Sequence, residues 1–359
     1  MYNRIYNFAA GPSQLPIEVL EEISKDLFNY KNTGMSVMEM SHRSKAYLEI
    51  FNDTKNTLRR VLDSPEDYEI IFMQGGATEQ FAAIPLNLKK NGKADYIVTG
   101  SFSKKAYNEA KKFIDARNIL DVGPIYNRIP KLEEIKINED ADYVYICANN
   151  TIYGTEWKQY PKTNGIPLVA DMSSDICSHK ININDFGLIY AGTQKNMGIA
   201  GLALVIIRKD LLKENALTMP VLFEYNTQVK NESMYNTPNT FAIYVLGLVL
   251  KWIESKGGVE ELEKKNIEKA QKLYDIIDAS EFYKGHALKD SRSLMNVTFN
   301  LPSEELETKF VQEAKKEGLE SLKGHRSVGG IRASIYNAMP LEAIEKLATF
   351  MKKFEEENK

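Results

Sequence analysis

The sequence predicts an α/β fold in which a mostly parallel sheet is covered by helices. Short apolar runs alternate with amphipathic stretches through the first two-thirds of the chain, the pattern of strands separated by helices. The apolar runs are almost uninterrupted, which is typical of strands buried on both faces of a parallel sheet. A length of 359 residues fits two domains, or one large domain with a smaller one.

The first part of the chain is expected to begin with a helix and to continue with a series of strands. The helix is predicted over 17–30, with Pro16 at its entry and apolar residues recurring on one face. Strands are predicted at 68–73, 95–100, 141–148, 166–171, 186–192 and 201–208. A helix follows each of the first two strands, and the second of these helices is expected to bury Phe113.

The last hundred residues predict a smaller α+β domain. Helices are expected at 254–278, 303–317 and 341–354, and strands at 295–301 and 329–336. The Gly257-Gly258 pair is a natural break, so we expect a large domain over 16–257 and a small one over 258–359, joined by the N-terminal segment 1–15. The tail KKFEEENK is expected to fray.

Composition narrows the classes of function. The chain is 43% hydrophobic and 26% charged, and its 46 basic and 49 acidic residues leave a net charge of −3, so neither disorder nor binding to nucleic acid or a membrane surface is expected. The longest uncharged apolar run, 241–250, is too short for a membrane span. Two cysteines, Cys147 and Cys177, and a start without a basic-then-apolar leader favour a cytoplasmic protein. We expect no metal site.

Lys195 and Asp171 are the first candidates for chemistry. Each stands at the end of a predicted strand, Asp171 in IPLVAD and Lys195 in AGTQKNMG, and ligands of parallel α/β sheets bind at the carboxyl ends of strands. An Asp and a Lys so placed are what pyridoxal phosphate requires, since the lysine binds the cofactor covalently and the Asp keeps its ring nitrogen protonated. The alternative is a solvated turn lysine beside one of the many aspartates that end strands.

A second pattern is typical of a phosphate site. GGATEQ (75–80) lies between a strand and a helix, where backbone N–H groups and the helix dipole attract an anion. A double glycine is also compatible with a simple tight turn. Phe102, just after another strand, could stack on a ring, although most aromatic residues near strand ends belong to the core.

Taken together, the motifs resemble the phosphoserine aminotransferase family, a branch of the class-V pyridoxal-phosphate-dependent aminotransferases. The resemblance covers nearly the whole chain and rests on NFAAGPSQLP, MSHRS, GGATEQF, GSFS, ANNTIYGTEW, ADMSSDI, GTQKNMGIAGLA, NTPNTFAIY and HRSVGGIRASIYNAM, in that order. It implies fold type I of the pyridoxal-phosphate-dependent transferases and a cytoplasmic homodimer that acts in serine biosynthesis.

The resemblance also implies the roles of individual residues. Lys195 would carry the cofactor covalently, and Asp171 would pair with its ring nitrogen. Further cofactor contacts are implied for Ala77, Thr78, Phe102, Thr151 and Gln194, and for Asn236 and Thr237 from the partner subunit. The chain departs from common family residues at Ala10, Thr78, Glu79 and Phe102.

The substrate side is expected to be cationic. Two of the four histidines occur in His-Arg pairs, His42-Arg43 and His325-Arg326. Both residues of such a pair can bind one phosphate, the arginine through a forked contact and the histidine through a titratable one. Solvated turn residues are the alternative. Arg332, in the strand GGIRAS, is expected to bind an α-carboxylate; otherwise it would form an ion pair at the rim.

The implied reaction is amino transfer between L-glutamate and 3-phosphohydroxypyruvate, which gives O-phospho-L-serine and 2-oxoglutarate. A second phosphorylated oxo acid, of the vitamin B6 route, is a further expectation from the resemblance. One alternative is a cysteine desulfurase, which needs a mobile cysteine late in the chain, whereas none follows Cys177. Another alternative is a binding protein of the same fold that has no catalytic activity. The presence of both Lys195 and Asp171 argues against it.

Overall fold

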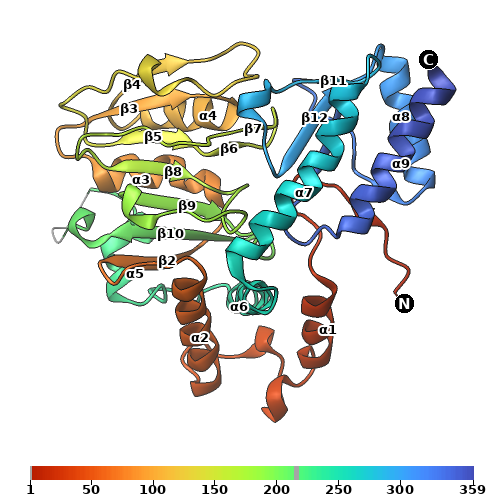
Figure 1. Ribbon diagram of the computed structural model, residues 1–359. Helices are drawn as coiled ribbons and strands as arrows, with labels where there is room; N and C mark the ends of the chain where they lie inside the picture. Colours follow the sequence, from red (N-terminus) through yellow and green to blue (C-terminus); the bar gives the residue numbers. More distant parts are fainter. Residues whose placement is uncertain (1, 214–217) are drawn as a thin grey trace.

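The computed structural model describes residues 2–213 and 218–359, and its largest element is a seven-stranded sheet (Figure 1). The strand order is β2-β10-β9-β8-β5-β3-β4. Their bounds are β2 Tyr68–Gln74, β3 Lys93–Val98, β4 Asp115–Asp121, β5 Val144–Cys147, β8 Leu168–Asp171, β9 Leu188–Gly192 and β10 Leu202–Arg208. All neighbours pair in parallel except β10, which runs antiparallel to β2 and β9. The mostly parallel sheet is therefore confirmed.

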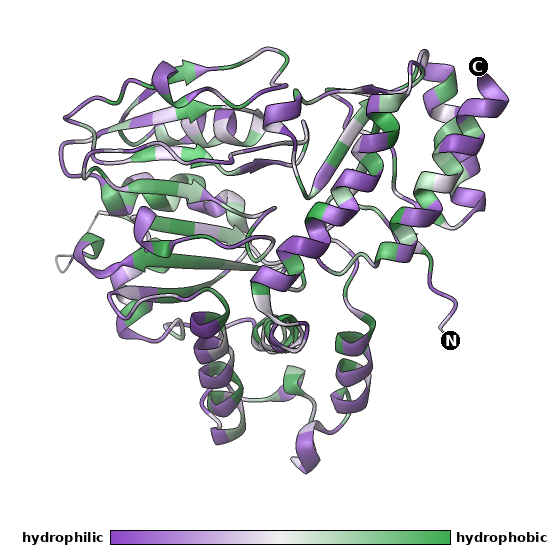
Figure 2. Ribbon diagram, viewed as in Figure 1, coloured by the Kyte–Doolittle hydropathy of each residue, from purple (hydrophilic) through white to green (hydrophobic). Residues whose placement is uncertain are grey.

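Helices cover both faces of the sheet, which explains the continuous hydrophobicity of its strands (Figure 2). One face packs against α2 (Lys45–Val61) and α6 (Thr240–Ser255) and includes Ile70 and Ile146. The other packs against α3 (Gln80–Leu88), α4 (Ser101–Ala110) and α5 (Tyr225–Lys230). Successive strand residues point to opposite faces, and both faces are buried here.

The C-terminal part forms a second layer around a three-stranded antiparallel sheet. This sheet has the order β11 (Lys284–Gly285), β12 (Asn296–Asn300) and β14 (Ile331–Ser334). Around it lie α7 (Gly258–Ala279), α8 (Glu304–Lys316) and α9 (Leu341–Asn358). In Figure 1, α7 runs diagonally between the large sheet and these C-terminal elements.

The N-terminal segment is built into the C-terminal part. Its strand β1 (Tyr6–Asn7) pairs in parallel with β13 (Leu319–Glu320), and Phe8 is fully buried in the C-terminal core. Helix α1 (Ile17–Asp26) then returns to the large domain, where it contacts α6. We propose that the division at residues 257 and 258 is a domain boundary, with α7 packing against both cores through its two ends.

The structure corrects several expectations. Helix α1 ends at Asp26, not at residue 30. Helix α2, strand β4 and most of α6 have no counterpart among the predicted elements. Phe113 is 37% exposed because α4 ends at Ala110, before the residue can turn inward. The tail is helical to Asn358, since Phe354 is buried in the C-terminal core and holds the last turns of α9.

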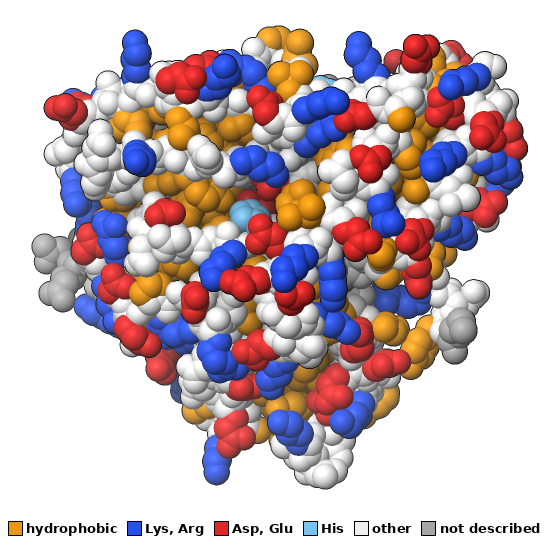
Figure 3. All heavy atoms as spheres, in the orientation of Figure 1, with side chains coloured by type: hydrophobic (Ala, Val, Ile, Leu, Met, Phe, Trp, Pro, Cys, Tyr) orange, Lys and Arg blue, Asp and Glu red, His pale blue; other side chains and the backbone are white. Residues whose placement is uncertain are grey.

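The face of the molecule drawn in Figure 3 carries interspersed charges of both signs. This mixture is what the near balance of basic and acidic residues requires. Within residues 2–213 and 218–359, no helix combines the length and the apolar composition that crossing a bilayer demands.

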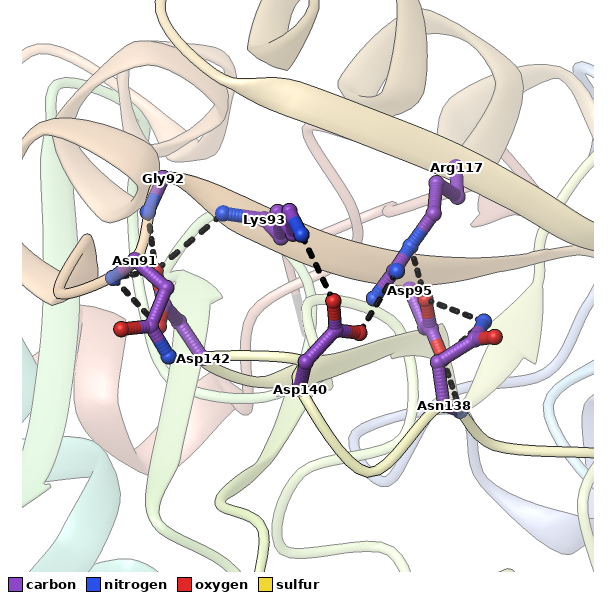
Figure 4. A network of polar contacts seen from close by, with 8 residues as sticks. All are labelled: Asn91, Gly92, Lys93, Asp95, Arg117, Asn138, Asp140 and Asp142. Carbon is purple, nitrogen blue, oxygen red and sulfur yellow. Dashed lines mark hydrogen bonds and ion pairs between the residues drawn. The ribbon is translucent and has the colours of Figure 1, made fainter.

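A polar network closes the amino end of the sheet, opposite to the carboxyl ends of its strands (Figure 4). The carboxylate of Asp142 accepts hydrogen bonds from the backbone N–H groups of residues 90–93. The fully buried Asp95 accepts from the Arg117 guanidinium at 2.8 Å and from the Asn138 N–H at 2.7 Å. Buried carboxylates paired in this way fix the loops at this end.

Candidate active site

The carboxyl ends of five strands, β2, β9, β8, β5 and β3, bring the predicted site residues to one edge of the sheet. Asp171 is the last residue of β8, and Lys195 follows β9 by three positions. The Gly75-Gly76 turn follows β2, Phe102 lies in the first turn of α4 after β3, and Thr151 follows the β5–β6 segment. This clustering is the ligand-binding position of open parallel sheets.

Lys195 lies at the centre of this cluster. Its Nζ is 2.7 Å from the hydroxyl oxygen of Thr151 and 5.9 Å from the centroid of the Phe102 ring. The N-terminal segment holds the lysine backbone in place, because the Ser13 hydroxyl donates to the Lys195 carbonyl at 2.6 Å. Gly11 passes so close that a Cβ there would lie 3.4 Å from the lysine Cγ. The N-terminal segment therefore holds the Lys195 backbone, and the lysine side chain points at Thr151.

Asp171 is buried, with 6% of its surface exposed. One carboxylate oxygen accepts from the Ser173 N–H at 2.9 Å, and the other accepts from the Tyr190 hydroxyl at 3.0 Å. No lysine or arginine within the described ranges forms an ion pair with it. Such a carboxylate can pair with a cationic ligand group, since each oxygen keeps a free lone pair.

The turn after β2 offers unpaired backbone donors. Within the part of the chain that the structure describes, the N–H groups of Gly76, Ala77 and Thr78 make no hydrogen bond. They stand at the start of the 3-10 turn Ala77–Glu79 that leads into α3, a position where free N–H groups can bind an anion. The Glu79 carboxylate folds over Gly75, where burial raises its pKa.

These residues fit pyridoxal phosphate. Lys195 supplies a primary amine, Asp171 a buried carboxylate without a cationic partner, and the turn after β2 a set of free phosphate donors. Phe102 presents its ring near the lysine Nζ. Gln194 folds back towards Gly192 at the same edge.

The substrate side gathers cations that have no acidic partner. Arg332, on β14, is half-buried, and neither it nor Arg326 forms a salt bridge or a side-chain hydrogen bond within residues 2–213 and 218–359. Burial and the positive charges of Arg332, Arg326 and Lys105 lower the pKa of His325, so three cations surround an imidazole that favours its neutral form. Desolvation also lowers the pKa of Arg332, although an arginine stays protonated at physiological pH.

The neutral form of His325 can donate a hydrogen bond to a ligand. Its Nδ1 accepts from the Ser327 backbone N–H at 3.2 Å, so the proton of the neutral ring must be on Nε2. The loop that carries it is compact, because the N–H groups of Val328 and Gly329 both donate to the His325 carbonyl. Val328 packs in the same apolar cluster as Phe102, which holds this loop against the cofactor side.

The structure does not bring all predicted residues together within one chain. His42 and Arg43 lie between the turn Val37–Glu39 and α2, and they have no hydrogen bond to the His325-Arg326 loop in the described residues. Asn236 and Thr237 are exposed in the loop before α6, and among the described residues only the Thr237 carbonyl accepts a hydrogen bond, from the Gln74 side chain at 2.6 Å.

Sequence reasoning missed two residues beside the site. Tyr190, the donor to Asp171, lies within an apolar strand and looks like a core residue. Lys105, whose Nζ lies 5.5 Å from the Phe102 ring centroid, is one helical turn after Phe102. The spacing of Phe102 and Lys105 by three residues was the available signal, because such residues share a helix face.

The close contact between the two parts of the chain beside Thr151 depends on one glycine. Gly154 has a φ of +69°, and a Cβ there would lie 2.5 Å from the Thr298 hydroxyl and 2.6 Å from the Asn296 carbonyl. The Thr298 hydroxyl donates to the Tyr153 carbonyl at 3.0 Å. Strand β12 therefore presses directly on the loop that positions Thr151.

Comparisons with known proteins agree with this geometry. The family model for class-V aminotransferases matches residues 5–347. The phosphoserine aminotransferase of Lysinibacillus sphaericus is 52% identical over 100% of both chains, and that of Geobacillus kaustophilus is 52% identical over 98% of both.

Solved structures match as well. The phosphoserine aminotransferase from Bacillus circulans subsp. alkalophilus has a TM-score of 0.97 at 47% identity, with 99% of each chain covered. The pyridoxal-phosphate-bound enzyme from Trichomonas vaginalis has a TM-score of 0.93 at 41% identity, covering 97% of this chain and 100% of that one. The fold is thus that of the pyridoxal-phosphate-dependent transferases, and the chain belongs to the class-V aminotransferases and, within them, to the phosphoserine aminotransferase family.

Proposed function

We propose that this enzyme transfers the amino group of L-glutamate to 3-phosphohydroxypyruvate, giving O-phospho-L-serine and 2-oxoglutarate. The observation that carries the proposal is a group of three cations, Lys105, Arg326 and Arg332, that surround His325 and have no acidic partner among the described residues. A substrate with both a carboxylate and a phosphate supplies the anions that these residues lack. The names of the full-length relatives support the same substrate.

The residues at the strand ends provide the amino-transfer chemistry. Pyridoxal phosphate, when bound, supplies the electron sink for the reaction. The Lys195 amine would hold it covalently, Asp171 would keep a proton on its ring nitrogen, and the N–H groups of residues 76–78 would bind its phosphate. The free Lys195 Nζ would accept the proton from the substrate α-carbon, and the Thr151 hydroxyl, 2.7 Å away, would orient it.

The cations divide the binding of the substrate between them. Arg332 is the most deeply placed and binds the α-carboxylate that every amino-acid substrate carries. Arg326 and the Nε2–H of His325 bind the distal phosphate. Because neutral His325 already donates, phosphate binding does not require acid pH.

Substitution of Arg326 by Ala is expected to reduce use of the phosphorylated oxo acid selectively. A charge-assisted hydrogen bond is worth about 1.5–3 kcal/mol, so loss of a forked pair lowers kcat/KM for 3-phosphohydroxypyruvate by about a hundredfold or more. Hydroxypyruvate, which lacks the phosphate, is expected to lose less than about threefold. Arg332→Ala is expected to impair both acids.

Rates are compared in single half-reactions from the pyridoxamine form, since glutamate could use the same cations for its side-chain carboxylate. Lys323→Ala, which removes an exposed cation from the same loop region, is the matched control and should keep wild-type selectivity. Equal losses for both acids in Arg326→Ala would show that Arg326 does not bind the phosphate.

We also propose that the enzyme is a homodimer with shared active sites. The segments of His42-Arg43 and of Asn236-Thr237 lie on one surface, because the Thr240 hydroxyl donates to the Val37 carbonyl at 3.3 Å. The same segments expose apolar side chains that a second copy would bury: Phe28 (84% exposed), Met35 (40%), Met38 (56%) and Tyr235 (49%). On this proposal these residues complete the partner's site.

Mixing two inactive variants is expected to restore activity. A Lys195→Ala chain and a chain with Asn236→Ala and Thr237→Ala give, after random exchange, mixed dimers with one intact site, or about a quarter of the wild-type sites. As a control, Lys195→Ala mixed with Asp171→Ala should restore nothing, because both residues act within their own chain. If exchange is demonstrated by mass and the first mixture stays inactive, the proposed sharing of sites is wrong.

The cysteines argue against sulfur chemistry. Cys147 and Cys177 are both free and buried, and burial raises the pKa of Cys177 to about 12 and that of Cys147 well above its usual value. Neither can present a thiolate to a substrate, as a cysteine desulfurase must. Because free thiols are typical of reducing compartments, we propose a cytoplasmic location.

A further inference from the structure

Two buried tyrosine hydroxyls stand in line behind Asp171. The Tyr190 hydroxyl lies 3.0 Å from Asp171 Oδ2, and the Tyr145 hydroxyl lies 2.7 Å from that of Tyr190. The three residues come from the neighbouring strands β9, β8 and β5 and point to the same face of the sheet, where Tyr145 and Tyr190 are almost completely buried. The reaction described above gives these hydroxyls no role.

The direction of the two hydrogen bonds follows from Asp171. An ionised carboxylate only accepts, so Tyr190 must donate to Asp171, and its oxygen is then left to accept the proton of Tyr145. Burial and the negative charge of Asp171 raise the pKa of both tyrosines well above its usual value, so both remain protonated donors. A chain of two aligned donors in a dry environment polarises each member and strengthens the bond to the carboxylate.

We propose that Tyr190, supported by Tyr145, is a positioning residue that holds the Asp171 carboxylate aimed at the ring nitrogen of the cofactor. Together with the Ser173 N–H, the Tyr190 hydroxyl fixes the orientation of the carboxylate, so its other lone pairs stay directed at the protonated nitrogen. Without the Tyr190 hydroxyl, the pairing of Asp171 with that nitrogen would weaken, and the ring would be a weaker electron sink. The inference rests on the proposed function, which assigns Asp171 to that nitrogen.

Tyr190→Phe removes one oxygen and little volume, and it tests the proposal directly. The rate of the half-reaction with glutamate is expected to fall by about tenfold to a hundredfold, as for loss of one hydrogen bond to a charged group. The pKa of the cofactor's visible absorbance is expected to rise, since a less protonated ring withdraws fewer electrons from the nitrogen of Lys195. Tyr145→Phe should lower the rate by about twofold to fivefold and raise the absorbance pKa by less than Tyr190→Phe does.

The double variant distinguishes a relay from two separate effects. If Tyr145 acts through Tyr190, Tyr145→Phe should have almost no further effect in the Tyr190→Phe background. Tyr143→Phe is the matched control, because Tyr143 shares a hydroxyl pair of 2.6 Å with Tyr96 on the same sheet face and has no hydrogen bond to Asp171 in the described residues. It should keep the wild-type rate and absorbance titration, and thermal melts verify that all four variants are folded.

The outcomes separate this inference from the function on which it rests. If the wild-type protein shows neither bound pyridoxal phosphate nor turnover, the proposed function fails. If the wild type is active and Tyr190→Phe has the same absorbance titration and a rate within about twofold of wild type, the positioning role is wrong. Equal losses in Tyr190→Phe and Tyr143→Phe would likewise overturn it, because the effect would then reflect sheet packing alone.

Discussion

Lys195→Ala is expected to abolish the visible absorbance of bound pyridoxal phosphate and to lower turnover by at least about a thousandfold. On the proposed function the lysine both holds the cofactor covalently and moves the proton of the substrate α-carbon, and general acid–base catalysis by one side chain contributes about 10²–10⁴ in rate. Among the described residues its Nζ bonds only to Thr151, so the substitution removes no buried ion pair and should leave the fold intact. Absorbance, steady-state turnover and the thermal melt measure these three effects.

Lys104→Ala is the matched control, because Lys104 is an exposed lysine of the same surface region, on α4. It should keep the wild-type absorbance and turnover. Near-normal turnover of Lys195→Ala, with a borohydride-reducible cofactor adduct on another lysine, would contradict the assignment of Lys195.

Asp171→Asn is expected to lower kcat by roughly a hundredfold to several thousandfold while the cofactor still binds. Removing one partner of a buried ion pair costs about 3–5 kcal/mol, and here the partner is the protonated ring nitrogen. Asparagine keeps the shape of the side chain. Because its amide has a single acceptor oxygen, it keeps only part of the hydrogen bonding to Ser173 and Tyr190. Asp171→Ala should be at least as severe.

The readouts are the single-turnover rate with glutamate and the pH titration of the cofactor absorbance, whose pKa should rise in Asp171→Asn. Asp175→Asn changes a second fully buried aspartate of the turn after β8, which has no hydrogen bond to Asp171 or Lys195 among the described residues, and it should lower kcat far less than Asp171→Asn. If Asp171→Asn retains the wild-type kcat, Asp171 does not hold the ring nitrogen.

Much of the fold could be predicted because each strand of the large sheet is a short apolar run bounded by turn residues. Helix α6 could not, since it is buried against both α2 and the sheet and has no polar face to reveal its period. Strand β4 lies at the sheet edge with four charged or amide residues among seven, so it resembles a loop. The end of α9 depends on Phe354, whose burial comes from tertiary packing and not from the local sequence.

The candidate site was predictable to the extent that its residues follow strands. Asp171, Lys195 and the Gly75-Gly76 turn meet because the carboxyl ends of parallel strands lie together. The influence of the Lys105 charge on His325 links segments more than two hundred residues apart, and no local pattern indicates it. Tyr190 was hidden for another reason: in a buried strand, a tyrosine that packs and a tyrosine that also donates to a carboxylate look the same in sequence.

The half-reaction of the wild-type pyridoxamine form with 3-phosphohydroxypyruvate, compared with hydroxypyruvate, tests the central claim most directly. Return of the pyridoxal absorbance in stopped flow gives kcat/KM for each acid without interference from glutamate. Because two charge-assisted contacts to the phosphate are worth about 3–6 kcal/mol, the phosphorylated acid is expected to react at least about a hundredfold faster. Equal rates for the two acids, or a faster reaction of hydroxypyruvate, would contradict the assignment of this enzyme to the phosphorylated substrate.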